Sequence, residues 1–217
     1  MTLRLLAPHA KLGHRAATYR LEPSLQPKIT IRGKTPLARA WGRMDNYHIT
    51  YVGADGTPRE YDREVYDHGL AASVLMYDPG TRQVLLTRQW RLPVELNGDA
   101  PVILEACAGM RDEGESAEAA ARREALEETG YEPQDLEFLF EVYPSPGALT
   151  EKVACYLARY TPGVRLGQGG GLPHEGEEIE VVELPLAEAL AMIRTGEIID
   201  AKTVMMLQAL QLRERLF

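Results

Sequence analysis

Residues Gly109–Tyr131 of the 217-residue chain read GMRDEGESAEAAARREALEETGY. The second half of this stretch, Ser116–Thr129, predicts a helix, because a serine is a good N-cap and the interior is rich in alanine. Gly130 supplies a typical C-terminal stop for that helix. The glycine-rich approach before Ser116 follows the apolar segment VILEACAGM at 102–110, which predicts a buried strand with Glu105 embedded in it.

Three carboxylates crowd one side of the predicted helix. At about 100° per residue, Glu127 and Glu128 flank Glu124 on a single stripe. Arg123 precedes Glu127 by four residues and offsets part of the repulsion. The stripe is either a solvated charged face or a cluster built for hard cations. We expect the neighbouring alanines to leave open space over the acids: Ala117, Ala120 and Ala121.

The spacing of this stretch resembles the Nudix box. That motif is Gly, five residues, Glu, seven residues, then Arg-Glu-aliphatic-any-Glu-Glu-any-Gly-aliphatic. Every fixed residue is present, and only two aliphatic positions depart from the pattern, at Ala125 and Tyr131. The matching positions are Gly109, Glu115, Arg123, Glu124, Ala125, Glu127, Glu128, Gly130 and Tyr131.

The resemblance extends over residues 45–212. Segments such as REVYDHG, LLTRQWR, YPSPGALTE and IRTGEIIDAKTV are similar to the nucleoside-diphosphate-sugar pyrophosphatases, most closely the GDP-mannose branch and next the ADP-ribose branch. This implies the Nudix fold, an α/β (α+β) protein in which an α/β/α sandwich is built on a mixed sheet. A small antiparallel β unit is expected to precede the sandwich.

The sequence predicts that the chain divides into three segments. Residues 1–27 predict an N-terminal arm to which we assign no role. Residues 28–68 predict the antiparallel unit, with strands at 28–33, 41–53 and 58–66 and a hairpin turn at 53–56. Residues 69–217 predict the Nudix domain, in which 92–101 is a loop and 186–196 and 201–217 are closing helices.

The resemblance also implies a metal site. Glu124 and Glu128 would be the main ligands of Mg²⁺, with Mn²⁺ able to substitute, because hard cations prefer oxygen ligands. The backbone carbonyl of Ala108 would be a further ligand. Glu127 would assist, and Arg123 would orient one of the box glutamates.

The candidates for the general base lie outside the box. Glu175 and Glu177 follow a glycine-rich loop, and the resemblance favours Glu175 as base and Glu177 as a further metal ligand. Glu151 in SPGALTE competes for the role of base, and an acidic turn without function is the alternative for the loop pair. Gly169–Gly171 lacks the Lys-Ser/Thr of a phosphate loop and predicts a hinge.

Arginines are candidates for contacts with the substrate phosphates. Strand alternation places Arg88 and Arg91 on opposite faces, and we favour Arg91 on the phosphates. Arg63 lies in a segment that, by resemblance, contributes to the site across a dimer interface. We therefore expect a homodimer in which the unpaired edges of the N-terminal strands contribute to pairing.

Composition limits the partners of the protein. A net charge of −8 argues against binding a nucleic-acid backbone, and no apolar run approaches the roughly 18 residues of a membrane span. Cys107 and Cys155 lie in apolar contexts and predict buried thiols, which fits a reducing, cytoplasmic compartment.

The expected activity is metal-dependent hydrolysis of a nucleoside diphosphate sugar, with GDP-mannose giving GMP and mannose 1-phosphate. The alternative substrate is ADP-ribose, which would give AMP and ribose 5-phosphate. A non-catalytic, nucleotide-binding sensor is the alternative of another class. Such a domain would be expected to lose box carboxylates, and this chain keeps them all.

Overall fold

The computed structural model describes residues 27–214, apart from the side chain of Glu175. Residues 1–26 of the predicted N-terminal arm therefore lie outside the described part. The described chain forms two compact units. The first contains 27–35 and 47–63, and the second contains 36–46 and 64–214.

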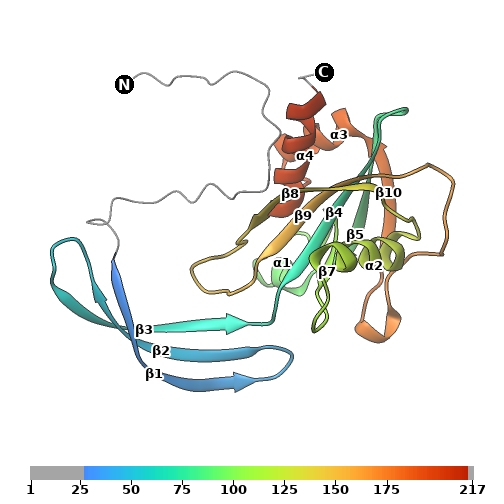
Figure 1. The fold of residues 1–217 in the computed structure, drawn as a ribbon. Helices are drawn as coiled ribbons and strands as arrows, with labels where there is room; N and C mark the ends of the chain where they lie inside the picture. The colour runs from blue at the N-terminus through green and yellow to red at the C-terminus, as the bar shows by residue number, and fades with distance from the viewer. Residues whose placement is uncertain (1–26, 215–217) are drawn as a thin grey trace, which may run out of the picture. The chain divides into compact units, whose positions relative to one another are not determined.

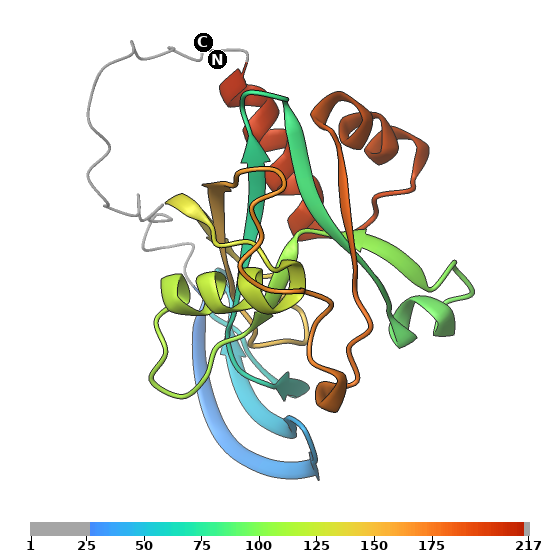
Figure 2. The ribbon, with the colours of Figure 1, turned by 90° about the vertical axis from the view of Figure 1, so that its right-hand side faces the viewer.

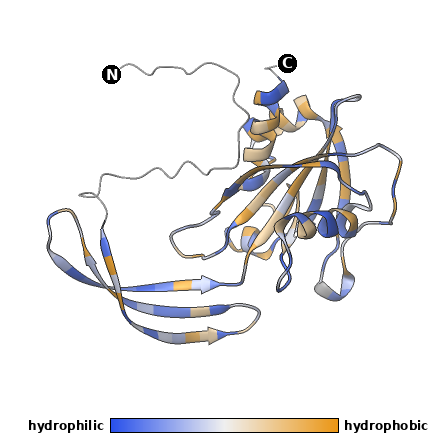
Figure 3. Cartoon of the chain, viewed as in Figure 1, coloured by the Kyte–Doolittle hydropathy of each residue, from blue (hydrophilic) through white to orange (hydrophobic). Residues whose placement is uncertain are grey.

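The N-terminal strands form a three-stranded antiparallel sheet in the order β1-β2-β3 (Figure 1). They are β1 (Lys28–Arg39), β2 (Arg43–Val52) and β3 (Pro58–Asp67). β1 extends six residues beyond the strand predicted at 28–33. Along β1 every residue except Thr30 is exposed, and hydrophobic residues are scattered among hydrophilic ones (Figure 3).

The second unit is built on a seven-stranded mixed sheet, as expected for the Nudix fold. Its path runs β10-β5-β4-β9-β8, with β6 paired to β5 and β7 paired to β4. The β4–β9 pair is parallel and the other pairs are antiparallel. The strands are β4 (Ala71–Asp78), β5 (Gln83–Trp90), β6 (Val102–Glu105), β7 (Cys107–Met110), β8 (Gln134–Val142), β9 (Val153–Arg159) and β10 (Glu180–Pro185).

Helices cover both faces of this sheet (Figures 1 and 2). The helix α2 (Ala117–Thr129) packs on one face, while α3 (Leu186–Thr195) and α4 (Ala201–Glu214) pack on the other. Alternate residues of the central strand β4 contribute to the two cores. Ala71, Leu75 and Tyr77 join the α3–α4 side, and Ala72, Val74 and Met76 join the α2 side.

Two segments between β5 and α2 differ from the prediction. The apolar stretch 102–110 is not one strand, because β6 pairs with β5 whereas β7 pairs with β4. Ala106 separates them, and its backbone N donates to Thr203 Oγ1 at 2.7 Å. The loop predicted at 92–101 begins with a short helix α1 (Leu92–Leu96), whose first turn accommodates a proline.

The glycine-rich loop caps the end of helix α2, and its role as a hinge stays a prediction. The N–H groups of Gly170 and Gly171 donate to the carbonyls of Glu128 and Glu127, at 2.8 and 3.1 Å. These carbonyls belong to the last turn of α2, where carbonyl groups have no hydrogen-bond partners within the helix. A Cβ on Gly169, whose φ is +69°, would lie 2.6 Å from the carbonyl carbon of Thr129. Only glycine therefore allows the loop to approach the helix end so closely.

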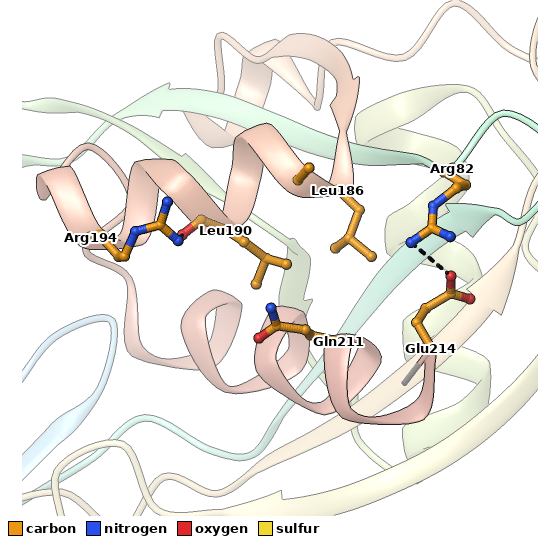
Figure 4. A pocket seen from close by; sticks show the side chains of 7 residues that line it. Arg82, Leu186, Leu190, Arg194, Gln211 and Glu214 are labelled. Atoms are coloured by element: carbon orange, nitrogen blue, oxygen red, sulfur yellow. Dashed lines mark hydrogen bonds and ion pairs between the residues drawn. The ribbon is translucent and has the colours of Figure 1, made fainter. Parts of the chain in front are cut away.

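A cavity of about 320 Å³ lies between α3 and α4 (Figure 4). Arg82 spans its edge and pairs with Glu214 at 3.2 Å. None of the predicted site residues lines it. Its lining residues are Arg82, Leu186, Ala187, Leu190, Arg194, Gln211 and Glu214.

Candidate active site

Helix α2 buries two of the box glutamates, Glu124 and Glu128, because it lies very close to the sheet. Ser116 caps its start, accepting from the N–H of Ala119 at 3.1 Å, and Gly130 ends it with a φ of +76°. Ala120 and Ala121 are completely buried against the sheet. Ala120 and Ala121 therefore pack helix α2 onto β4 and β7 and, contrary to the prediction, are not what leaves open space at the acids.

Gly109 on β7 makes room for one of these carboxylates. A Cβ at this position would lie 2.0 Å from Glu124 Oε1, well inside van der Waals contact. Glu124 is 7% exposed, and it occupies the space that any larger residue at 109 would fill. The glycine of the box is thus required by the packing of the glutamate.

Glu128 is the most deeply buried carboxylate of the helix, with 1% of its surface exposed. Its Oε2 accepts from the backbone N–H of Ala108 at 3.3 Å, and its Oε1 has no hydrogen-bond partner among the described residues. Burial raises the pKa of Glu128 to about 8 and that of Glu124 to about 7. The negative charge of Glu177 is a smaller cause of both increases in pKa.

Arg123 donates hydrogen bonds to three glutamates of the box. Its Nη1 donates to Glu124 Oε1 at 2.7 Å and to Glu127 Oε2 at 3.0 Å. Its Nε and Nη2 donate to the carboxylate of Glu115 at 3.1 and 3.0 Å, and Nη2 also reaches the carbonyl of Met110 at 2.8 Å. The predicted role of orienting a box glutamate is consistent with this geometry.

Of the box carboxylates, Glu124 lines a cavity of about 910 Å³ in the second unit, whereas Glu115, Glu127 and Glu128 do not. Of the predicted site residues, it is lined by Arg91, Ala108, Arg123, Glu124, Glu151 and Glu177. Aromatic and apolar side chains complete part of the wall, among them Trp41, Trp90, Leu92, Pro93 and Met205. A large pocket with a few convergent polar groups is typical of a ligand site.

The two loop glutamates and their competitor lie as follows. Glu177 accepts from the backbone N–H of Leu172 at 2.9 Å and lines the cavity. Glu175 ends the 3₁₀ helix η2 (Pro173–Glu175), but its side chain lies outside the described part of the structure. Glu151 also lines the cavity, 3.7 Å from His68 Nε2. The assignment of the base between Glu175 and Glu151 stays a prediction.

The arginines have different positions. Arg91 lines the cavity and contacts Glu105 through Nε at 2.8 Å. Arg88, on β5, forms an ion pair with Glu180 at 2.9 Å and does not line the cavity. The structure therefore gives no support to Arg88 as a phosphate ligand. Arg63, in the N-terminal unit, lies over the ring of Tyr61 at 4.7 Å, and its role stays a prediction.

Lys202 is a cavity residue that was not predicted from the sequence. It lies in the first turn of α4, where its Nζ donates to Glu105 at 3.0 Å and to Asp200 at 2.9 Å. Asp200 also accepts from the N–H of Thr203 at 2.9 Å and so caps the helix. The available signals were the Asp200-Ala-Lys-Thr sequence at a helix start and the charged Glu105 within an apolar strand.

The donor groups fit a divalent cation. Within residues 27–214, no three His, Cys, Asp or Glu side chains are grouped closely enough to hold a metal as they stand. The Oε1 of buried Glu128 nevertheless has no competing hydrogen-bond donor, and the absence of a side chain at Gly109 leaves room for the carboxylate of Glu124. Oxygen donors of this kind suit a hard cation such as Mg²⁺.

Comparison with known proteins identifies the family. Residues 67–207 match the model of the NUDIX domain, so the chain belongs to the Nudix family. Within that family it is similar to GDP-mannose pyrophosphatases. The one from Cronobacter sakazakii is 46% identical over 169 residues, which cover 76% of this chain and 87% of the relative. The one from Escherichia coli K12 is 45% identical over 174 residues, covering 77% and 90%.

A solved structure supports the fold independently. The crystal structure of an ADP compounds hydrolase superposes with a TM-score of 0.68 at 23% identity, covering 89% of this chain and 98% of the other. The predicted Nudix fold and the family assignment are thus confirmed.

Proposed function

We propose that this protein is a Mg²⁺-dependent hydrolase of nucleoside diphosphate sugars, with GDP-mannose giving GMP and mannose 1-phosphate. The observation that carries the proposal is a complete set of box carboxylates, in which Glu124 and Glu128 are buried and Glu124 lines a large cavity. The similarity to GDP-mannose pyrophosphatases over three quarters of the chain supports the choice of substrate. The carboxylates argue against a non-catalytic sensor.

Glu124, Glu128, Glu177 and the carbonyl of Ala108 would hold the cation. When bound, a divalent cation offsets the negative charge of the pyrophosphate oxygens and lowers the pKa of water. Arg123 orients Glu124 and Glu127 through two hydrogen bonds from one nitrogen. Arg91 and Lys202 supply positive charge at the cavity wall, which suits the phosphate groups of the substrate.

A carboxylate must accept the proton of the attacking water, and Glu175 and Glu151 are the two candidates. Glu175 follows the loop that caps α2, while Glu151 lines the cavity. If Glu175 is the base, Glu175→Gln lowers kcat far more than it changes KM. A larger loss of kcat in Glu151→Gln would assign the role to Glu151.

The proposal is tested with a panel of substrates. GDP-mannose, ADP-ribose, ADP-glucose, NADH and a nucleoside triphosphate are compared for hydrolysis with Mg²⁺, with Mn²⁺ and with a chelator. We expect GDP-mannose to have the highest kcat/KM and the chelator to abolish turnover. A preference for ADP-ribose would select the alternative substrate, and no turnover of any compound would favour a sensor.

The oligomeric state and location are also proposals. Homodimer formation is supported by the exposed three-stranded sheet of the N-terminal unit, whose edges can pair with another chain. In the described residues no helix is both long and apolar enough to cross a membrane. The cytoplasmic location rests on the two cysteines, which are buried and free in the structure.

A further inference from the structure

Glu105 is a buried carboxylate that holds two cations of the cavity wall. It ends β6, is 5% exposed and does not itself line the cavity. Its Oε2 accepts from Arg91 Nε at 2.8 Å and lies 2.7 Å from Arg91 Nη2. Its Oε1 accepts from Lys202 Nζ at 3.0 Å. One carboxylate therefore bridges the residue that follows β5 and another at the start of α4.

The negative charge of Glu105 offsets the repulsion between Arg91 and Lys202. Arg91 and Lys202 bind the same carboxyl group, so their positive charges lie only a few ångströms apart and repel each other. Burial alone would lower the pKa of Lys202, but the charges of Glu105 and Asp200 outweigh it and the pKa is raised. Lys202 is thus kept as a cation next to Arg91.

Both cations retain hydrogen-bond donors for a ligand. Among the described contacts, Glu105 engages Nε and Nη2 of Arg91, and a guanidinium carries five N–H groups. Glu105 and Asp200 together engage two of the three N–H groups of the Lys202 ammonium. A pair of cations with free donors and a fixed separation is suited to a ligand with two adjacent anionic groups.

We propose that Glu105 is a positioning residue, which fixes Arg91 and Lys202 as a preassembled pair for the anionic part of the substrate. This inference rests on the proposed function for the identity of the substrate. The pair itself can be examined separately with inorganic pyrophosphate, because that probe requires only the anion-binding groups.

The central test is Glu105→Gln, which keeps the size of the side chain and removes its charge. The amide can accept from one cation but turns an NH₂ group toward the other. We expect KM for GDP-mannose to rise about tenfold or more, while kcat changes less than about threefold. The affinity for inorganic pyrophosphate, measured by titration calorimetry without Mg²⁺, should fall by a similar factor.

A matched control separates this effect from the general cost of losing an ion pair. Glu137→Gln breaks another pair between a carboxylate and an arginine, in which Arg213 donates to Glu137 at 2.6 and 2.8 Å. Neither residue lines the cavity. We therefore expect Glu137→Gln to leave KM and pyrophosphate affinity unchanged.

A double-variant cycle shows whether Glu105 acts through Arg91. In an Arg91→Met background, Glu105→Gln should raise KM by a clearly smaller factor than in the wild type, because one of the two positioned cations is gone. The same factor in both backgrounds would overturn the inference, as would unchanged KM and pyrophosphate affinity in Glu105→Gln.

A second variant covers failure of Glu105→Gln to fold. Glu105→Asp keeps the buried charge but is one methylene shorter, so it cannot reach both cations at their present positions. We expect a raised KM in this variant as well, and a wild-type KM would overturn the inference. The two proposals can fail separately. If the wild type hydrolyses no nucleotide sugar, the proposed function is refuted. If either variant then still loses affinity for pyrophosphate, the positioning role is supported.

Discussion

Glu128 is the residue on which the proposed metal site depends most. Replacing it with Gln keeps its volume and removes the charge from an oxygen that has no partner among the described residues. We expect kcat/KM to fall more than about 100-fold, since loss of even an outer-shell partner costs 10–100-fold in metal sites. The melting temperature should not fall, because no stabilising ion pair is broken.

Glu118→Gln is the matched control on the same helix. Glu118 is exposed and pairs only with Arg122, at 3.0 Å, among its described ion pairs. Its replacement should leave kcat/KM unchanged. Full activity in Glu128→Gln would remove Glu128 from the metal site.

Gly109→Ala tests the close packing of strand β7 against Glu124. The new Cβ would overlap the carboxylate, 2.0 Å from Oε1, so the glutamate must move. We expect a loss of stability of about 1–3 kcal/mol in denaturant unfolding, together with a large loss of kcat/KM. Gly33→Ala is the control, since a Cβ there meets no atom within 4 Å and φ is not positive.

The box residues could be predicted from the sequence because their spacing is local. Glu124, Glu127 and Glu128 share a stripe in any helix that spans them. Lys202 and Glu105 could not be found this way, because they are far apart in the chain and meet only when α4 packs behind β6. The burial of the alanine face was missed for the same reason, since it depends on how closely the helix approaches the sheet.

At the scale of elements, the glycine-rich loop and helix α2 form one structural feature. Gly169→Ala would place a Cβ 2.6 Å from the backbone of Thr129, and neither backbone can yield easily. Gly163→Ala is a matched control with a similar φ of +77° and no atom within 4 Å of the new Cβ. It should cost only the backbone strain of about 1–2 kcal/mol.

The difference in unfolding free energy between these two variants isolates the contact. We expect Gly169→Ala to be less stable than Gly163→Ala by at least about 1 kcal/mol, and to lose activity as the end of α2 shifts. Equal stability of the two variants would show that the loop does not hold the helix end.

The limits of the helix α2 were predictable because its caps are local signals, whereas strand partners are not. Ser116 and Gly130 start and stop the helix as expected. The division of 102–110 into β6 and β7 depends on two different neighbouring strands and on the bond from Ala106 to Thr203. An apolar sequence does not indicate where the chain changes from one neighbouring strand to another.

At the scale of the whole molecule, the N-terminal sheet leads us to predict a dimer. Ile29 and Ile31 lie on one face of β1 and are 58% and 63% exposed. Light scattering at micromolar concentration should give twice the chain mass of 24.2 kDa. Ile29→Lys combined with Ile31→Lys should shift the protein to monomers, because lysine disfavours edge pairing and apolar contact.

Leu212→Lys serves as the control, since it replaces a leucine that is 61% exposed on α4 in the other unit. It should leave the dimer intact. A wild-type monomer at this concentration would exclude the proposed contribution of Arg63 to the site of a partner chain.

The position of the central strand β4 between two cores affects how the second unit unfolds. Val74 belongs to the core beneath α2 and Leu75 to the core beneath α3 and α4, and neither is exposed. Neither helical layer can separate from the sheet without exposing one side of this strand to water. The two layers should therefore melt in a single cooperative transition, and the amide protons of β4 should be among the slowest of the unit to exchange with solvent.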